Sequence, residues 1–437
     1  MLIIKIINER DTTMKKVKIG VLGAGRGKTM MNYCLHSQNA ELVAVCDFYE
    51  PFLEDLKKWT KKENEEMAAG ITYYTDFEEF IKHDMDAVVL ANFANEHAPY
   101  AVRCMKEGKH VMSEVLAFQN VKEAVDLIET VEETGKIYAY AENYCFMPAP
   151  REMRRLKLEG KLGKIEYAEG EYLHNCEPIW DRITYGLPEH WRNKMSGLYY
   201  CTHSIGPMIH IAGERPVKVS GFEVAYNDRC ARMGALGSPI GIAMITLENG
   251  AVLKSVHGVG PYTNSVWYSV YGSNGRAESA REATDKGVDT MYLMMDDAPY
   301  AGNVMYKPTE KLSSKAASAG HGGSDFYTMY FFCEKILGDE EAEIVDVYEA
   351  TDMMLAGLFA YRSCLNNNAS MEIPNLRIKS ERDKWRNDTA TWDEEAAGDM
   401  LQPSYSLGNP EVPQEVYDYW KKKWSETHGG EERKYRY

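Results

Sequence analysis

The feature that most constrains the fold is a glycine-rich turn that directly follows a buried strand. Residues 17–25 read VKIGVLGAG, and an amphipathic helical pattern follows as far as Cys34. Buried strands and amphipathic helices go on alternating up to Glu142. Parallel strands need a crossover helix between them, so this rhythm predicts a parallel sheet of about six strands over residues 15–142.

The pattern changes after Glu142. Long runs of period-two alternation, such as IEYAEGEYLH and IGIAMITLENGAVLKSVHG, follow a short helical stretch. They predict an open, mostly antiparallel sheet, and helical spacing returns over 325–365. The expected fold class is therefore α/β, with an N-terminal parallel sheet and a second α/β domain over 143–375. Residues 376–437 are charged and aromatic, and we expect a solvated surface wrap there, with an oligomer contact as the alternative.

The first fourteen residues form a leader ahead of the first patterned segment. Their short apolar stretch is broken by Lys5 and followed by charged residues, which does not fit a signal peptide. Met14 is a candidate natural start, and a short pairing strand over residues 2–7 is the alternative. The chain has no uncharged apolar run near the roughly 18 residues that a membrane span needs.

Charge and cysteine content narrow the partners and the compartment. The chain has 50 Lys and Arg against 66 Asp and Glu, a formal net charge of −16, which repels nucleic acid and anionic membrane surfaces. Its 9 cysteines form no CxxC pair, and an odd number cannot close fully into disulfides. We therefore expect a cytoplasmic protein that binds neither nucleic acid nor membrane.

The glycine-rich turn has the composition of a phosphate-binding loop. Gly23, Gly25 and Gly27, with Arg26 among them, lie where backbone N–H groups and a helix N-terminus hold a pyrophosphate. The spacing departs from the usual motif, because the third glycine is expected at the position of Lys28. A bare tight turn is the alternative.

Asp47 strengthens the nucleotide interpretation. It ends the second predicted strand, 24 residues beyond Gly23, where a carboxylate accepts hydrogen bonds from the adenosine ribose. Its charge would repel an additional phosphate at that place, so NAD is favoured over NADP.

Four further residues follow the later strands of this sheet, where the nicotinamide end of the cofactor is expected. Asn92, Asn95 and His97 follow the fourth strand, and helix capping is the alternative for His97. Asn143 follows the last strand, where a role at the domain junction is the alternative.

Residues 86–129 resemble the Gfo/Idh/MocA oxidoreductases, with the framework HAP…GKHV.SE intact. The resemblance extends over roughly residues 15–365. It implies an NAD(P)-binding Rossmann domain joined to an open-faced α/β domain that presents a sugar to the nicotinamide.

One departure from that family decides which branch the chain resembles. Its dehydrogenases carry Glu-Lys-Pro where this chain has Glu114-Val115-Leu116, and valine cannot transfer a proton. The Ser-Glu-Val-x-Ala form over 113–117 instead resembles the NAD-dependent α-N-acetylgalactosaminidase branch, glycoside hydrolase family 109. Three further segments agree with that branch: Ala141-Glu142-Asn143, the stretch 191–207 with Leu-Tyr-Tyr-Cys-Thr-His-Ser-Ile-Gly-Pro, and Gly320-His321-Gly322-Gly323-Ser324-Asp325.

The resemblance implies roles for several residues. Tyr200 and His203 would bracket the sugar near the nicotinamide, Glu114 would contact cofactor or substrate, and His321 with Asp325 would lie at the rim of the pocket. The branch normally has asparagine where this chain has Gly197, and Tyr-Gly-Arg where this chain runs Tyr144 to Pro148.

The stretch 191–200 also offers a platform for a sugar. Aromatic rings pack on sugar C–H faces while arginine reaches hydroxyl groups, and core packing is the alternative for each of these residues. The platform candidates are Trp191, Arg192 and Tyr199, together with Trp180 earlier in the chain. The histidines show no HxH or HExxH spacing, so no metal site is predicted.

These observations lead to three functional hypotheses. The first is a glycoside hydrolase that oxidises C3 of its sugar, eliminates, hydrates and reduces again, with His203 and Tyr200 moving the proton of the C3 hydroxyl and Tyr144 as candidate base at C2. The second is a sugar or inositol dehydrogenase in which His203 replaces the missing lysine, and the third is a non-catalytic NAD-binding sensor. Long alternating strands that one helix layer cannot cover on both faces predict a homodimer or homotetramer.

Overall fold

The computed structural model describes residues 15–281, 290–295, 302–309, 312–317 and 319–428. The leader over residues 1–14 lies outside the described residues, and so does the alternative strand over 2–7. The final nine residues of the C-terminal extension also lie outside them.

The N-terminal half forms sheet A, in which the described residues supply six parallel strands in the order β3-β2-β1-β4-β5-β6. The strands are β1 (Val17–Leu22), β2 (Ala40–Cys46), β3 (Thr72–Tyr74), β4 (Ala87–Leu90), β5 (His110–Ser113) and β6 (Tyr138–Tyr140). The predicted parallel sheet is confirmed. Strand order reverses between β1 and β4, the point at which ligands bind in open α/β sheets.

The crossover helices cover the two faces of sheet A. They are α1 (Lys28–His36), α2 (Glu50–Glu63), α3 (Glu65–Ala68), α4 (Phe77–Phe80), α5 (His97–Lys106) and α6 (Val121–Thr134), with a short 3₁₀ turn η1 (Ala94–Glu96). Residues from far along the chain complete this layer, because Met329, Phe332 and Cys333 share a core cluster with Met30 and Met31 of α1.

The C-terminal half forms sheet B, where the described residues supply nine strands in the order β14-β13-β12-β11-β7-β10-β9-β8-β15. The strands are β7 (Ile165–Leu173), β8 (Pro216–Glu223), β9 (Gly241–Leu247), β10 (Val252–Gly258), β11 (Ser265–Gly272), β12 (Gly275–Ser279), β13 (Met291–Met295), β14 (Gly302–Tyr306) and β15 (Met371–Glu372). Only β7 and β10 pair in parallel among these strands, so the predicted, mostly antiparallel sheet is confirmed.

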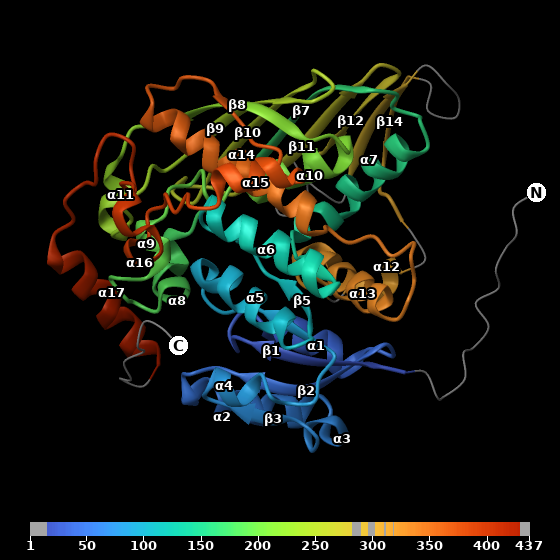
Figure 1. The fold of residues 1–437 in the computed structure, drawn as a ribbon, viewed down its shortest axis with the longest axis vertical. Coiled ribbons are helices and arrows are strands. Elements are labelled where there is room, and N and C mark those ends of the chain that lie inside the picture. The colour runs from blue at the N-terminus through green and yellow to red at the C-terminus, as the bar shows by residue number, and fades with distance from the viewer. Residues whose placement is uncertain (1–14, 282–289, 296–301, 310–311, 318, 429–437) are drawn as a thin grey trace, which may run out of the picture.

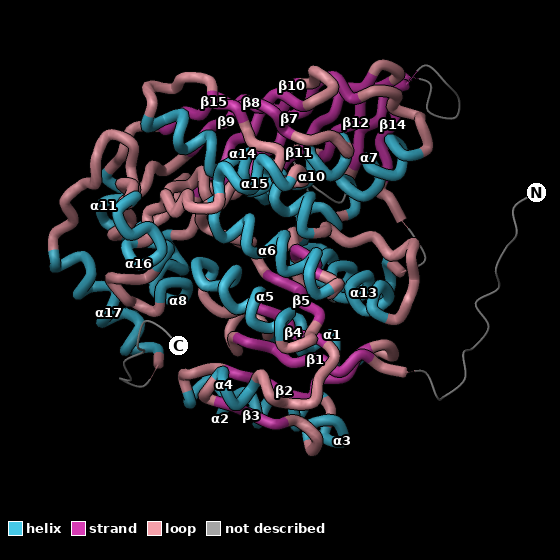
Figure 2. Tube along the Cα trace, in the orientation of Figure 1, coloured by secondary structure: helices cyan, strands magenta, loops and turns pink. Residues whose placement is uncertain are grey.

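A layer of helices lies between the two sheets (Figure 2). The helices of this half are α7 (Pro148–Leu158), α8 (Trp180–Thr184), α9 (Trp191–Lys194), α10 (Thr202–Ala212), α11 (Asp228–Met233), α12 (Ser313–Ala316), α13 (Ser324–Ile336) and α14 (Val347–Leu365), with 3₁₀ turns η2 (Asn143–Phe146), η3 (Glu177–Ile179) and η5 (His321–Gly323). Helices α7, α10 and α14 lie on the inner side of sheet B (Figure 1).

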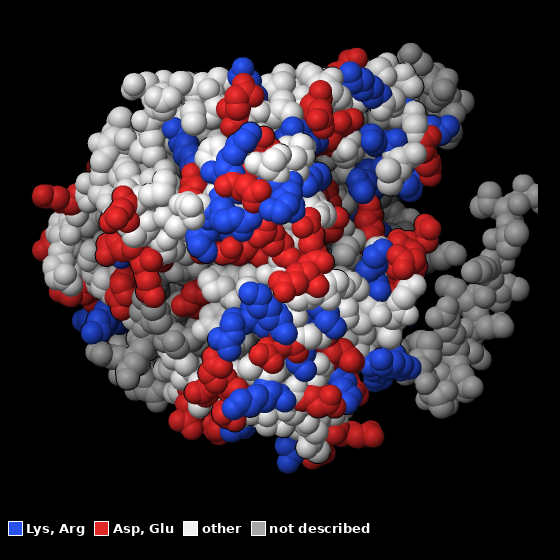
Figure 3. Space-filling model, in the orientation of Figure 1, with Lys and Arg blue, Asp and Glu red and all other residues white. Residues whose placement is uncertain are grey.

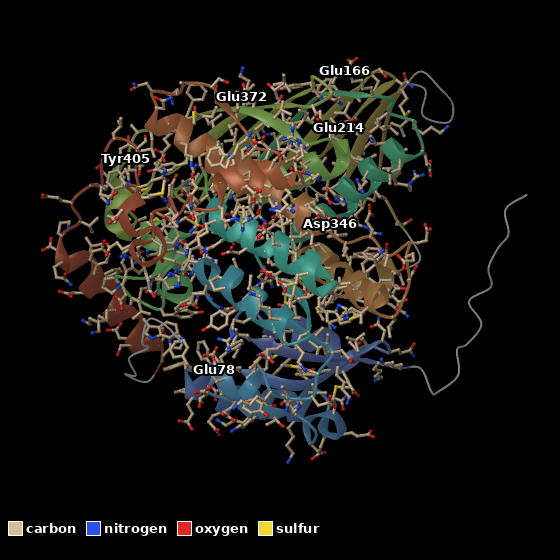
Figure 4. All side chains as sticks on the ribbon, viewed as in Figure 1. Glu78, Glu166, Glu214, Asp346, Glu372 and Tyr405 are labelled. Atoms are coloured by element: carbon tan, nitrogen blue, oxygen red, sulfur yellow. The ribbon has the colours of Figure 1, made fainter. Side chains whose placement is uncertain are left out.

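The outer side of sheet B carries no helix among the described residues (Figure 1). Glu166 and Glu372, labelled in Figure 4, lie along this outer margin. Large apolar side chains alternate with charged ones there, and several of them are exposed, including Phe222, Met244 and Met294. The sheet thus has one packed face and one bare face.

The C-terminal extension packs against both halves of the molecule. Its elements are α15 (Lys379–Trp385), α16 (Glu394–Ala397), the 3₁₀ turn η6 (Gly398–Met400) and α17 (Gln414–Thr427). Basic side chains around α15 meet acidic side chains of α6 (Figure 3), with Arg382 2.7 Å from Glu132 and Arg386 2.6 Å from Glu129.

The aromatic residues of the extension are more deeply placed than a solvated wrap implies. Trp392, Trp420 and Trp424 are all buried, and Trp420 belongs to a small core with Cys176 and Cys230. The expectation of a purely solvated extension is therefore corrected, because these rings need an apolar partner that the charged residues around them do not supply.

All nine cysteines lie within the described residues, and all nine are buried and unpaired. Within the described part of the chain, none of the helices combines the length and the hydropathy that a membrane span requires.

Candidate functional site

The glycine-rich turn lies at the carboxyl end of β1 and leads into α1. Gly23 has a φ of +99°, and a Cβ there would lie 2.3 Å from the carbonyl oxygen of Ala91 at the end of β4. Only glycine allows this turn to pack so closely on the neighbouring strand. Helix α1 begins at Lys28 immediately after Gly27, so the amides of the turn and the helix N-terminus face the same place.

Asp47 directly follows β2 and holds the turn in position. One of its carboxylate oxygens accepts a hydrogen bond from the backbone N–H of Ala24 at 2.8 Å, and the other accepts from Tyr49 at 2.9 Å. The side chain is 1% exposed. Asp47 therefore shapes the loop besides standing at the position expected for a ribose contact.

A buried polar network joins the glycine turn to the second domain. The Arg26 guanidinium lies 2.7 Å from Glu114 and 3.0 Å from Asp325. Asp325 also accepts a hydrogen bond from the Asn143 amide at 2.8 Å and pairs with His321 at 2.9 Å. Five residues proposed from the sequence thus meet in one cluster, although Arg26 and Asp325 are 299 positions apart.

The charges of this network shift the titration of its members. Burial raises the pKa of Glu114, and the nearby Arg26 guanidinium opposes that shift. The pKa of Asp325 lies well below its ordinary value, because its contacts with His321 and Arg26 outweigh the penalty of burial. Asp325 is therefore an anion that holds Arg26, Asn143 and His321 in fixed orientations.

Asn92, Asn95 and His97 follow β4, but they make different contacts. The Asn92 amide lies 3.3 Å from Glu96, and the Asn95 amide donates to Asp393 of the C-terminal extension at 2.8 Å. His97 lies behind the segment that contains Val115, with Nδ1 2.8 Å from the Leu116 carbonyl oxygen. These contacts hold Asn95 and His97 in position. The cofactor role predicted for the two residues stays a prediction.

The burial of His97 predicts that the folded protein loses stability in mild acid. Burial lowers the pKa of His97 to about 4 from an ordinary value of 6.5, so the unfolded chain binds a proton that the folded chain resists between these values. The contribution of His97 to the free energy of unfolding should be fully present above pH 6.5, and the free energy of unfolding should fall by about 3 kcal/mol as the pH drops to 4. Urea titrations across this range measure the slope.

Two variants test that assignment. His97→Asn keeps a donor for the Leu116 carbonyl oxygen and cannot titrate, so its stability should fall less in acid. The exposed His36→Asn variant is the control and should follow the parent curve. Parallel curves for His97→Asn and the parent would show that another group causes the acid loss.

The second cluster centres on His203, at the start of α10. Its Nδ1 lies 2.7 Å from Oε1 of Glu142, which is fully buried and just follows sheet A. The same carboxylate caps η2 by accepting the N–H of Tyr144. A buried carboxylate on Nδ1 fixes the tautomer of the ring and directs Nε2 away as the reactive nitrogen.

Local packing explains why this pair forms. A Cβ at Gly206 would lie 2.8 Å from the Glu142 side chain, so glycine one turn after His203 allows α10 to approach η2. Ser204 contacts Ser255 of β10 at 2.7 Å, and the Tyr268 hydroxyl donates to the His203 carbonyl oxygen. Helix α10 is thus anchored to sheet B and presents His203 toward the first domain.

Aromatic side chains surround the His203 ring. Ring centroids lie 4.4 Å away for Tyr144, 4.8 Å for Tyr172 and 5.2 Å for Tyr200. Burial raises the pKa of the Tyr144, Tyr172 and Tyr200 phenols, so all three favour the protonated form. The predicted catalytic residues His203, Tyr200 and Tyr144 therefore lie together as a histidine among phenol donors.

A cavity of about 1020 Å³ opens beside this cluster. Tyr144, Tyr172, His174 and His321 line one part of it, and α7, residues 264–266, the segment 307–309 and α12 line much of the remainder. Its size is at the upper end for small-molecule sites. Tyr144 and His321 therefore connect the cavity to both polar clusters.

The predicted sugar platform divides into two parts. The Arg192 guanidinium lies 4.1 Å from the Trp191 ring and 5.2 Å from the Tyr200 ring, which builds a cation and aromatic stack next to His203. Tyr199 does not join it. Its ring is fully buried against Tyr361, and its hydroxyl contacts Gln402, so the structure gives Tyr199 a packing contact.

Three site residues were missed by the sequence analysis as candidates. In the sequence, Glu142 stands out only as part of a segment that matches the branch, and Tyr172 and His174 only as members of a strand pattern. Period-two alternation identifies β7 but does not show which of its side chains faces a ligand. Among the described residues, no group of three or more His, Cys, Asp and Glu side chains could hold a metal ion.

Two family models match the chain. One, described as "Oxidoreductase family, NAD-binding Rossmann fold", matches residues 17–142. The other, described as "Glycosyl hydrolase 109, C-terminal domain", matches residues 242–387. Together they include most of both sheets.

Curated relatives agree with these models. A "Glycosyl hydrolase family 109 protein 1" from Bacteroides thetaiotaomicron is 26% identical over 407 residues, which covers 83% of this chain and 85% of the relative. An "Alpha-N-acetylgalactosaminidase" from Bacteroides fragilis is 30% identical over 203 residues, covering 45% of this chain and 48% of the relative.

Solved structures share the fold. An oxidoreductase domain protein from Kribbella flavida matches with a TM-score of 0.66 at 17% identity, covering 83% of this chain and all of the other. A scyllo-inositol dehydrogenase from Lactobacillus casei, solved with NAD(H) and scyllo-inositol, matches with a TM-score of 0.63 at 20% identity, covering 82% and 99%. The chain therefore carries the NAD-binding Rossmann domain of the Gfo/Idh/MocA oxidoreductases followed by the C-terminal domain of glycosyl hydrolase family 109.

Proposed function

We propose that this protein is an NAD-dependent glycoside hydrolase that acts by transient oxidation at C3, elimination, hydration and re-reduction of its sugar. The observation that carries the proposal is the buried Glu142–His203 pair, set among Tyr144, Tyr172 and Tyr200 beside the large cavity. The curated relatives supply the substrate class, a glycoside, with an α-N-acetylgalactosaminide as the first probe.

The described residues fit NAD. The turn from Gly23 to Gly27 presents amides at the start of α1, and Asp47 lies beside it. The buried carbonyl oxygens of the Asn92 and Asn143 amides have no hydrogen-bond partner among the described residues, so both can accept from a bound ligand. When bound, NAD supplies the reversible hydride transfer at C3 that a redox-neutral route requires.

His203 is our proposed base at the C3 hydroxyl. Glu142 holds the proton on Nδ1 and stabilises the imidazolium that forms when Nε2 accepts the hydroxyl proton. Tyr200, whose ring centroid lies 5.2 Å from that of His203, is our proposed hydrogen-bond donor to the same sugar oxygen. Returning that proton at the end of the cycle needs no further group.

Tyr144 is our proposed group for the proton at C2. Burial raises the pKa of Tyr144, so a free phenolate is disfavoured and the phenol has to give up its proton as it takes one. The adjacent His203 ring already holds the proton of the C3 hydroxyl at this stage, so Tyr144 would donate its phenolic proton to the departing glycosidic oxygen while it accepts the proton from C2. Tyr144→Phe should therefore block elimination while leaving NAD binding intact.

Val115 stands where the dehydrogenases that the chain resembles carry a lysine. The side chain is 6% exposed and packs in the main core cluster, so this position supplies no proton-transfer group and the C3 hydroxyl proton is assigned to His203 instead. The solved dehydrogenases share the fold, which by itself fixes no chemistry.

Turnover of an aryl α-N-acetylgalactosaminide in deuterated water tests the proposal. The released sugar should contain deuterium at C2, and deuterium placed at C3 of the substrate should remain there. NADH should not accumulate. Stoichiometric NADH with a free sugar would instead support the dehydrogenase, and NAD binding without either reaction would support the sensor.

Asp47 should determine the choice between the two nicotinamide cofactors. Asp47→Ala removes an acceptor that also holds Ala24, so we expect NAD binding to weaken about tenfold or more and its advantage over NADP to shrink. Asp47→Asn is the matched variant, which removes the charge alone and should chiefly improve NADP binding. Calorimetric titration measures both, and equal affinities in the parent protein would remove the basis for the claim.

We also propose that the protein assembles as a homodimer or homotetramer through the bare face of sheet B. Met294 is 51% and Phe222 43% exposed there, and charged pairs such as Lys254 with Glu169 lie between such residues. Light scattering should give a mass that is a multiple of 49.7 kDa. Phe222→Asp should reduce the mass to one chain, and a single-chain mass for the parent at micromolar concentration would contradict the proposal.

A further inference from the structure

We propose that the C-terminal helix α17 and the turn at Tyr185 form a cover over the phosphate and ribose side of the NAD site and slow release of the cofactor. The cover consists of Tyr185, His190 and Trp424, which pack on Phe52 and Phe93 of the first domain. It gives the C-terminal extension a specific function that follows from its contacts.

The cover contacts the Rossmann domain where the dinucleotide is expected. Phe52 lies in the first turn of α2, just after Asp47, and its ring centroid is 6.2 Å from Tyr185 and 6.5 Å from Trp424. Phe93 follows β4 and is 6.0 Å from Tyr185 and 5.0 Å from His190. The aromatic cluster therefore bridges the carboxyl ends of β2 and β4, on either side of the glycine turn.

Tyr185 lies directly over that turn. A Cβ built on Gly25 would meet the Tyr185 hydroxyl oxygen at 3.3 Å and the Phe52 ring at 3.8 Å. Gly25 is the residue at which a backbone approaches a pyrophosphate. The Tyr185 hydroxyl is thus placed to donate to a phosphate oxygen, and its ring to shield that oxygen from water.

Helix α17 holds the Tyr185 turn in place. Trp424 is 5.3 Å from Tyr185, and a Cβ on Gly186 would lie 2.7 Å from the Trp420 carbonyl oxygen, so the two backbones touch. Trp420 donates to the Arg232 carbonyl oxygen at 3.0 Å, and Lys423 lies 3.4 Å from Asp181 of α8. Helices α17 and α8 run side by side (Figure 1).

A buried donor in this cluster also points to a ligand. Trp424 is 3% exposed, and its indole N–H has no hydrogen-bond acceptor among the described residues. A buried N–H without an acceptor is costly, and the phosphate and ribose oxygens of NAD are acceptors of the kind it lacks.

The release rate of NAD tests the cover. The purified protein is loaded with isotopically labelled NAD, chased with excess unlabelled NAD, and the retained label is counted after gel filtration at set times. Trp424→Ala removes the ring that spans Phe52 and Tyr185, and we expect release to accelerate on the order of ten- to a hundredfold. Tyr185→Phe removes only the hydroxyl and should accelerate release several-fold.

Tyr419→Ala is the matched control, because it truncates an aromatic side chain of the same helix that is 56% exposed. It should release NAD at the parent rate. Circular dichroism and melting of each variant separate faster release from unfolding, and Tyr185→Phe is expected to keep the parent fold. Release rates of Tyr185→Phe and Trp424→Ala that equal the parent rate would overturn the inference.

The inference rests on the proposed function only through NAD binding. The release assay contains no sugar, so it can fail while the deuterium pattern of glycoside turnover holds. Conversely, the parent protein could lack glycosidase activity while Trp424→Ala still releases NAD faster than the parent. That result would support the cover and refute the proposed reaction.

Discussion

Replacing His203 by alanine is expected to lower the rate of glycoside cleavage by about 10²- to 10⁴-fold, the effect of losing a general acid and base. His203 is the ring that Glu142 orients, and it lies among the three tyrosines beside the cavity. The measurement is kcat for an aryl glycoside at saturating NAD. Added imidazole should restore part of the rate by occupying the space that the substitution leaves.

Glu142→Gln is the companion variant for that experiment. It keeps the size of the side chain and an acceptor for Nδ1 but removes the charge that stabilises the imidazolium, so we expect a smaller loss and an altered pH profile of kcat. NAD binding should be unchanged in both variants, because neither residue contacts the glycine turn. Unchanged turnover in His203→Ala would refute the proposed proton path.

The second large effect is expected at Gly23. Gly23→Ala places a Cβ 2.3 Å from the Ala91 carbonyl oxygen, which is backbone and cannot move aside, at a φ of +99°. The left-handed backbone conformation and the steric overlap of the new Cβ together should lower the free energy of unfolding by about 3 kcal/mol and abolish measurable NAD binding. Chemical denaturation and calorimetry measure the two losses.

Two glycine variants separate the causes. Gly250→Ala, in the turn between β9 and β10, has a φ of +88° but no atom within 4 Å of the new Cβ, so it should cost about 1 kcal/mol and leave NAD binding intact. Gly25→Ala meets nothing closer than 3.3 Å, so it should fold normally and weaken NAD binding. Equal NAD affinity in Gly23→Ala and the parent would show that the turn does not hold the cofactor.

Much of the fold could be predicted because its signals are local. A buried strand that runs into Gly23 and Gly25, with a carboxylate at the end of the next strand, specifies the first domain within thirty residues or so of chain. The alternation over residues 165–174 identifies β7 in the same way. Neither signal extends to the packing of α13 on α1, which depends on apolar residues that lie about three hundred positions apart.

The site was predicted where a motif kept its residues together and missed where it depends on distant contacts. His203 and Tyr200 come from one short segment, whereas Glu142 becomes meaningful only when α10 is placed against η2. Tyr199 and Tyr200 are neighbours in a turn, yet one packs against α14 and the other lies beside His203. Residue type and spacing do not determine which of two adjacent tyrosine rings faces the site and which packs in the core.

The buried cysteines have a practical consequence for following motion in this protein. Burial raises the pKa of each of these thiols, so alkylating reagents should leave the folded chain unlabelled. Cys176 and Cys230 share a small core with Trp420 of α17, whereas Cys34 lies in α1, in the core between that helix and sheet A. The order in which mass spectrometry detects labelled thiols therefore reports which layer opens first, and departure of the C-terminal helix would register at Cys176 and Cys230 while Cys34 stays protected.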